Sequence, residues 1–86
     1  MDIERYLTEQ SFEETGGGNW GENQQNPDDS FGAYLSMAGR TAGVVVWVFA
    51  DHFIAFRDGE DPTDVAVRYG RTVAELTKAI DALVIN

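Results

Sequence analysis

The chain has 86 residues, 43% of them hydrophobic, and it contains no cysteine. This length corresponds to one small domain, and domains near this size bury only about 60–65% of the surface that the unfolded chain exposes. The lack of cysteine excludes disulfide bonds, thiolate zinc sites and thiol catalysis. Fifteen acidic residues against six basic ones give a net charge of −9, so the chain is strongly acidic.

The sequence has no feature of membrane insertion or secretion. Its first residues lack the basic flank and the apolar run of a signal peptide. The longest apolar stretch, residues 42–50, is too short to span a bilayer and is followed at once by Asp51 and His52. We therefore expect a cytoplasmic protein.

The negative charge is concentrated in the first third of the chain. Residues 1–30 contain eight acids and one base, which gives −7, whereas residues 31–86 sum to −2. We expect an acidic arm over 1–30, with a short helix and a loop, and a compact helical domain over 31–86. An acidic surface is attracted to basic grooves that normally hold nucleic-acid phosphates. Adaptation to high intracellular salt is the alternative, and it would make the acidity uninformative about partners.

The first expected element is a short helix over residues 3–12. Its apolar residues Ile3, Tyr6 and Leu7 recur at helical spacing, and Asp2 can cap the first turn.

A flexible loop is expected next, because residues 15–30 are rich in Gly, Asn, Gln and Asp. The glycines at 16–18 follow no predicted strand and precede no Gly-Lys-Ser or Gly-Lys-Thr, so they do not indicate a phosphate-binding loop. Trp20 is the one large apolar residue of this loop, and it can anchor a partner because Trp is favoured at binding hot spots.

Two helices are expected in the hydrophobic middle of the chain. The first carries Phe31, Tyr34, Leu35 and Ala38 on one face, and the second covers about residues 42–57. The valine-rich run leaves an alternative open, because β-branched residues also favour strands.

That alternative is a central hairpin within residues 44–57, with strands 44–50 and 53–57 and a turn at Asp51-His52. It would make the fold α+β. A two-residue turn at that point lacks the Asn-Gly or Gly chemistry of the usual hairpins, which favours the helix.

The last third of the sequence predicts a helix-turn-helix pair. Asp61 precedes Pro62 as a cap before a proline at the first helical position, and Gly70 ends this helix. Thr72 and Glu75 form a capping box that opens the second helix. Apolar residues then keep helical spacing to the end of the chain: Val73, Leu76, Ile80, Leu83 and Val84. The expected fold class is therefore all-α.

The segment from Ala66 to Gly70 resembles the helix-turn-helix of DNA-binding regulators, in which a small residue lets two helices cross closely and the glycine takes a left-handed turn conformation. More narrowly, residues 40–83 are similar to an antitoxin-like helix-turn-helix family of unknown function. The matching positions are Gly39, Arg40, Thr41, Asp58, Gly59, Pro62, Val65, Ala66, Tyr69, Gly70 and Thr72. The resemblance implies a regulator or antitoxin that reads DNA through residues 71–78. The basic residues that would form a small DNA-binding patch are Arg68, Arg71 and Lys78.

The charges argue against direct binding of nucleic acid. Arg71, Glu75, Lys78 and Asp81 sum to zero along the last helix, whereas a protein that positions phosphates normally has a basic footprint. A helix pair of this kind also closes a small core, and that structural role is the interpretation we favour.

No catalytic, cofactor or metal site is expected, and we predict that the protein is not an enzyme. His52 is the single histidine and lies on an aromatic stripe, and no serine is spaced to form a triad with it. Paired carboxylates such as Asp28 and Asp29 lack the spacing of a calcium loop, and helix capping explains them better.

The leading hypothesis is a non-enzymatic acidic inhibitor, a DNA mimic that binds the basic nucleic-acid-binding surface of a protein partner. In size and charge the chain is similar to small phage-encoded anti-CRISPR and anti-restriction proteins. The predicted contacts are Glu9, Glu13, Glu14, Glu22, Asp28 and Asp29, with Trp20 as an apolar anchor.

The alternative hypothesis is an antitoxin-like transcriptional regulator whose acidic arm binds a basic toxin. A homodimer would follow if aromatic residues stayed uncovered, with Phe31, Tyr34, Trp47 and Phe53 as the candidates for its interface.

Overall fold

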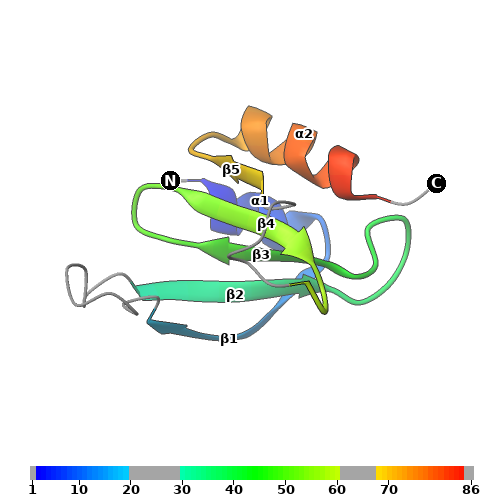
Figure 1. Cartoon of the computed structure of the whole chain (residues 1–86), viewed down its shortest axis with the longest axis horizontal. Coiled ribbons are helices and arrows are strands. Elements are labelled where there is room, and N and C mark those ends of the chain that lie inside the picture. The colour runs from blue at the N-terminus through cyan, green and yellow to red at the C-terminus, as the bar shows by residue number, and fades with distance from the viewer. Residues whose placement is uncertain (1, 20–29, 61–67, 85–86) are drawn as a thin grey trace.

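The computed structural model describes residues 2–19, 30–60 and 68–84. Its elements in chain order are α1 (Ile3–Glu9), β1 (Phe12–Asn19), β2 (Ser30–Ser36), β3 (Val44–Val48), β4 (Phe53–Arg57), β5 (Arg68–Gly70) and α2 (Val73–Leu83). The strands form one antiparallel sheet in the order β1-β2-β3-β4-β5, so each strand pairs with its neighbour along the chain. In Figure 1, α2 lies along the β5 side of the molecule and β1 forms the opposite edge.

The two helices and one face of the sheet enclose the hydrophobic core. Ile3 and Leu7 of α1 and Leu76 of α2 are fully buried there. The sheet contributes alternate residues of its strands, because successive side chains of a strand point to opposite faces. The strand residues of the core are Phe12, Tyr34, Val44, Val46, Val48, Phe53 and Ala55. Among the described residues, neither helix is long and apolar enough to cross a membrane.

The other face of the sheet is also apolar. Phe31 of β2 and Trp47 of β3 stack with their ring centroids 4.2 Å apart, and Trp47 meets Phe56 of β4 edge-on at 5.1 Å. As a result β3 has apolar residues on both faces, and every residue from Val44 to Val48 except Trp47 is buried.

The prediction of an all-α fold is wrong, and the alternative of a central hairpin is closer to the structure. β3 and β4 pair along their whole length, from Val44 opposite Arg57 to Val48 opposite Phe53. The turn between them spans residues 49–52, with the Phe49 N–H donating to the His52 carbonyl over 2.8 Å. This bond leaves two residues, Ala50 and Asp51, to connect the strands, and neither has a positive φ, so the turn is not one of the primed types that need Asn-Gly or Gly.

Two further segments form strands where a helix and a loop were expected. Phe31, Tyr34 and Leu35 lie in β2, where Tyr34 faces the core and its neighbours face the other side. Residues 15–19 belong to β1, which pairs with β2 and contains a β-bulge between Glu14 and Gly16. Backbone pairing with β2 gives this glycine-rich segment an order that its composition does not indicate.

The helix-turn-helix prediction is also wrong. Residues 68–70, expected as the end of a helix, form β5 and pair with β4; residues 61–67, where the predicted helix begins, lie outside the described ranges. Gly70 does not take the left-handed conformation that the resemblance implied. It is required for a different reason: a Cβ atom at Gly70 would lie 2.8 Å from the ring of Phe53 and 2.9 Å from Cβ of Glu75.

The two terminal helices are confirmed, although α1 is shorter than the expected 3–12. The predicted N-cap of α2 is confirmed, because Thr72 Oγ1 accepts the Glu75 N–H at 3.1 Å; the returning bond of the capping box is shifted by one residue, since Glu75 Oε1 accepts the Arg71 N–H at 3.1 Å. Asp2 occupies the N-cap position of α1, but its side chain makes no capping hydrogen bond. The apolar faces predicted for both helices are those that the core buries.

Candidate protein-binding surface

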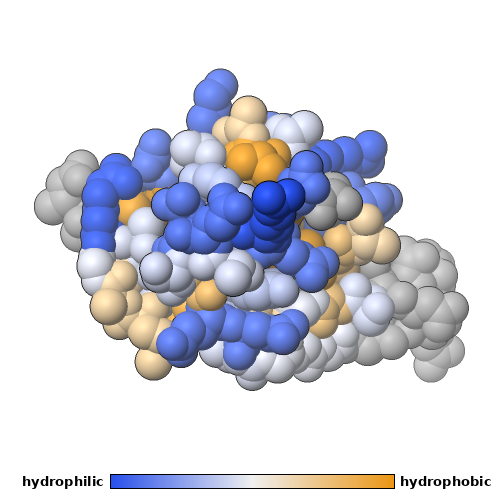
Figure 2. Space-filling view, turned by 180° about the vertical axis from the view of Figure 1, so that it is seen from behind, coloured by the Kyte–Doolittle hydropathy of each residue, from blue (hydrophilic) through white to orange (hydrophobic). Residues whose placement is uncertain are grey.

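Five exposed carboxylates lie on α1, on β1 and at the residue before α1. We call these the N-terminal acidic surface: Asp2, Glu4, Glu9, Glu13 and Glu14. The one base in residues 2–19 is Arg5, whose Nε lies 3.4 Å from Oε1 of Glu9, so the segment has a net charge of −4. Viewed from behind, hydrophilic residues cover much of the middle of the molecule (Figure 2).

Two of these carboxylates come close to Tyr34 from different elements. The Tyr34 hydroxyl donates to Glu4 Oε2 over 3.4 Å, which links β2 to α1. Glu14 lies directly opposite Tyr34 in the β1–β2 register, so both side chains point to the same face of the sheet. The pKa of the Tyr34 phenol is raised, first by burial and then by the negative charges of Glu4 and Glu14.

The raised pKa makes a testable pH prediction. The folded state favours the neutral Tyr34 phenol, so this group's contribution to stability is complete below the pKa of an unfolded tyrosine and is lost as the pH rises through the folded value. Glu4→Gln should lower the pKa of Tyr34 toward the ordinary value, measured by NMR titration of its ring. Glu9→Gln on the same helix is the control and should leave it unchanged. An unchanged pKa in Glu4→Gln would contradict the proposed contact.

The predicted contact residues fall into two groups. Glu9, Glu13 and Glu14 are exposed as a binding role requires, while Trp20 and the remaining acids Glu22, Asp28 and Asp29 lie outside the described residues. The structure adds Glu4, which the sequence analysis counted as charge but not as a contact. Its position between Ile3 and Leu7, the buried residues of α1, could have indicated that it flanks the core.

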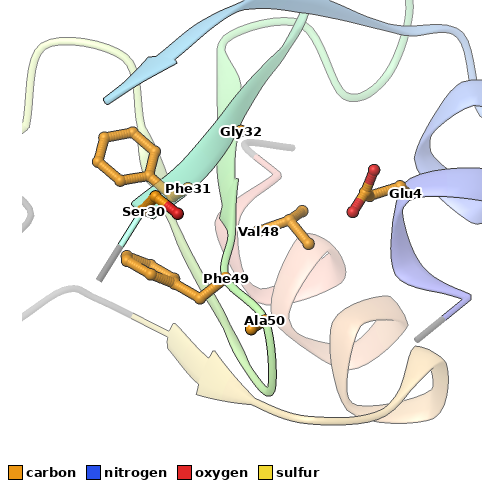
Figure 3. Close-up of a pocket in the computed structure, with 7 residues that line it drawn as sticks. All are labelled: Glu4, Ser30, Phe31, Gly32, Val48, Phe49 and Ala50. Atoms are coloured by element: carbon orange, nitrogen blue, oxygen red, sulfur yellow. The ribbon is translucent and has the colours of Figure 1, made fainter. Parts of the chain in front are cut away.

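A hollow of about 260 Å³ opens beside Glu4, at the ends of β2 and β3. Figure 3 shows the Glu4 carboxylate reaching from α1 toward Val48, while the rings of Phe31 and Phe49 lie on the other side of the strands. Of the described residues that line it, Glu4 is the titratable one. Within the described ranges, no three His, Asp or Glu side chains are grouped to hold a metal ion.

His52 takes part in an aromatic cluster, as its position on an aromatic stripe suggested. Its ring stacks on Phe49 at 4.4 Å and lies 5.2 Å from the ring of Tyr69. Its Nδ1 is 2.7 Å from Oδ1 of Asp51, and this hydrogen bond is the main reason why the pKa of Asp51 is lowered, with the charge of Arg71 contributing less. Packing and this single carboxylate account for the position of the ring.

Arg71 and Lys78 are the basic residues of the alternative hypothesis whose side chains the structure describes, and each has an acidic side chain nearby. Arg71 is exposed, and its pKa is raised mainly by a hydrogen bond to Tyr69, with Asp51 and Glu75 adding negative charge. Lys78 is exposed on α2 and lines a second hollow of about 260 Å³ together with Tyr69, Glu75 and Ala79. The backbone of Arg68 belongs to β5.

Two of the four aromatic residues named for a dimer interface are buried. Tyr34 and Phe53 belong to the core, with exposed fractions of 7% and 0%. Phe31 and Trp47 lie on the opposite face of the sheet and are partly exposed.

In comparisons with known proteins, the chain matches no family model, no curated protein and no solved structure.

Proposed function

We propose that this protein is a non-enzymatic inhibitor that acts in the cytoplasm by binding the basic, nucleic-acid-binding surface of another protein. The observation that supports this most is the N-terminal acidic surface, because its carboxylates are exposed and are attached to ordered elements of the fold. Fixed carboxylates can meet basic side chains without first losing the conformational freedom of a flexible segment. The anti-CRISPR and anti-restriction classes of inhibitor use this kind of complementarity.

The distribution of charge also supports a specific surface. Residues 2–19 have a net charge of −4. Residues 31–86 have a net charge of only −2, although this segment is about three times as long. Two of the bases outside the acidic surface are engaged within the fold: Arg40 Nη1 lies 3.1 Å from Asp81 Oδ1, and Arg57 Nη1 donates to the Leu83 carbonyl over 2.6 Å. General adaptation to salt would spread the excess acid over the whole chain.

The alternative function as a DNA-binding regulator is not proposed. It depended on a helix-turn-helix, and residues 68–70 form a strand instead. Arg71, its central basic residue, lies beside Asp51 and Glu75, which reduce its attraction for phosphate.

The experiment that tests the function compares two double variants with the same loss of charge. Glu13→Gln/Glu14→Gln removes two charges from the acidic surface, while Asp58→Asn/Glu60→Gln removes two exposed charges after β4. Glu60 Oε1 accepts the Arg57 N–H, and a glutamine there keeps an oxygen for this bond. Each protein is immobilised, host lysate is passed over it, and the bound proteins are eluted with duplex DNA.

The wild type and the Asp58→Asn/Glu60→Gln control should retain the same partner, and duplex DNA should release it. The Glu13→Gln/Glu14→Gln variant should bind it at least about tenfold more weakly, because close charge pairs at an interface contribute about 1.5 kcal/mol or more. Equal retention by all three proteins, or a partner that DNA does not displace, would show that the proposed function is wrong.

A further inference from the structure

The outer edge of β1 is the longest open edge of the sheet. β1 has eight residues and stands at one end of the strand order, whereas β5 at the other end has three. Every residue from Glu13 to Gly18 is exposed. In the part of the chain that the structure describes, no strand pairs with the side of β1 that faces away from β2 (Figure 1).

The hydrogen-bond directions in β2 identify which backbone groups of β1 point outward. The Ser36 carbonyl accepts the Gly43 N–H over 2.9 Å, so the backbone groups of Ser36 face away from β1. Because directions alternate along a strand, Leu35 faces β1 and pairs with Glu13. The N–H and C=O of Glu14, one residue further along β1, therefore point away from the sheet.

The same argument applies beyond the bulge. The Thr15 hydroxyl donates to the Ala33 carbonyl over 3.4 Å, so the backbone of Ala33 faces β1, where its register partner is Gly16. The backbone groups of Gly17 consequently point outward. These outward groups of Glu14 and Gly17 pair with no other strand among the described residues, and an exposed edge of this kind is the template that an added strand uses.

The side chains along this edge select the kind of strand that fits. Glu14 lies on the helix-covered face of the sheet and Glu13 on the other face, so a strand added to β1 would meet a carboxylate on each side. A second copy of the chain paired through β1 with Glu14 opposite Glu14 would bring like charges together, which is destabilising, and in any register it would add one acidic strand to another. A strand with basic residues on one face would instead gain from the carboxylate on that face.

The glycines at the far end of β1 leave room for apolar contact. The Phe31 ring lies over Gly18, because a Cβ there would be 3.3 Å from the ring carbon Cζ. Gly18 has no side chain to separate this ring from an incoming strand. Diagonal neighbours across strands remain within reach of aromatic side chains. An added strand in which apolar and basic residues alternate would place its apolar side chains on the face of Phe31 and its basic side chains on the helix-covered face, where Glu14 lies.

We propose that the outer edge of β1 binds an extended basic segment of the partner protein as a sixth strand of the sheet. The segment alternates arginine or lysine with apolar residues, and Glu14 and Gly17 supply the backbone hydrogen bonds. This inference rests on the proposed function, since it specifies how the acidic surface engages its partner.

The test uses the full chain and two synthetic peptides of about the length of β1. One peptide alternates arginine with valine. The other has the same sequence with its central backbone amides N-methylated, which keeps the charge and removes the hydrogen bonds of a strand.

The affinity of each peptide is measured by calorimetry, and the protection of the protein's amides is measured by NMR hydrogen exchange. The unmodified peptide should bind at least about tenfold more tightly, which corresponds to about 1.4 kcal/mol, and should protect the amides of Glu14 and Gly17. Glu14→Gln should weaken this binding, and Asp58→Asn should not.

The possible contrary results separate this inference from the function on which it rests. Equal, salt-sensitive binding of both peptides overturns strand addition but leaves the acidic surface as a binding surface. If neither peptide binds, strand addition is overturned, and the lysate experiment then decides the function independently. Without peptide, the amide protection of Glu14 and Gly17 should not depend on protein concentration. A rise of this protection with concentration would identify a second copy of the chain as the occupant and would overturn the proposed binding of a basic segment.

Discussion

Gly70→Ala should lower the free energy of unfolding by about 1–3 kcal/mol, the range for overpacking a well-filled core. The added methyl would lie 2.8 Å from Cε2 and Cζ of Phe53 and 2.9 Å from Cβ of Glu75. Phe53 is fully buried, so its ring cannot turn into solvent to make space. Urea-induced unfolding, followed by circular dichroism, measures the change.

A second substitution distinguishes crowding from backbone strain at this position. If crowding by Phe53 causes the loss, Phe53→Leu should partly compensate for Gly70→Ala, and the double variant should be more stable than the sum of the two single effects. Gly59 provides the contrast, because its φ of +94° is left-handed and nothing lies within 4 Å of a Cβ there. Asparagine should therefore cost backbone strain alone at Gly59 and should destabilise the protein less there than at Gly70. Additive effects in the double variant would contradict this explanation.

The helices could be predicted because their signals are local. In α2, the capping box of Thr72 and Glu75 lies just before apolar residues at helical spacing, and both features depend only on neighbours in the sequence. α1 is similar, with Ile3 and Leu7 on one face. Each helix is polar on its other face, so its periodicity is unambiguous.

The helix was favoured over the central hairpin because both faces of the central sheet are apolar. Val44 and Val46 face the helices, while Val45 and Trp47 face the aromatic cluster, so the sequence shows a continuous apolar run without alternation. Such a run cannot be separated from a buried helix by periodicity alone. The β-branched composition of residues 44–48 was the better indicator.

The acidic surface could be predicted as a charge imbalance but not as a geometry. The excess of acid in residues 1–30 is visible in the sequence, and it led to Glu9, Glu13 and Glu14. That Glu4 and Glu14 come together at Tyr34 follows from the β1–β2 register and the packing of α1, which are long-range pairings. The open edge of β1 likewise depends on a strand that the glycine-rich composition concealed.

Leu7→Ala should lower the free energy of unfolding by about 2–5 kcal/mol, the usual cost of truncating a buried leucine. The Leu7 side chain is fully buried in the core shared by α1, α2 and the sheet. Small domains have a total stability of about 5–15 kcal/mol, so this loss is a large fraction of it. Arg5→Ala on the exposed side of the same helix is the control and should change stability by less than about 0.5 kcal/mol.

The same pair of variants connects the core to the proposed binding surface. If α1 were an independent arm, Leu7→Ala would leave the melting transition of the sheet unchanged, and that result would contradict the packing described above. If α1 is part of the core, loosening it also releases Glu4 and Glu9 from their fixed positions, because α1 positions both. Partner binding by Leu7→Ala should then weaken at temperatures where the sheet is still folded, while Arg5→Ala, which removes the base beside Glu9, should bind at least as tightly as the wild type.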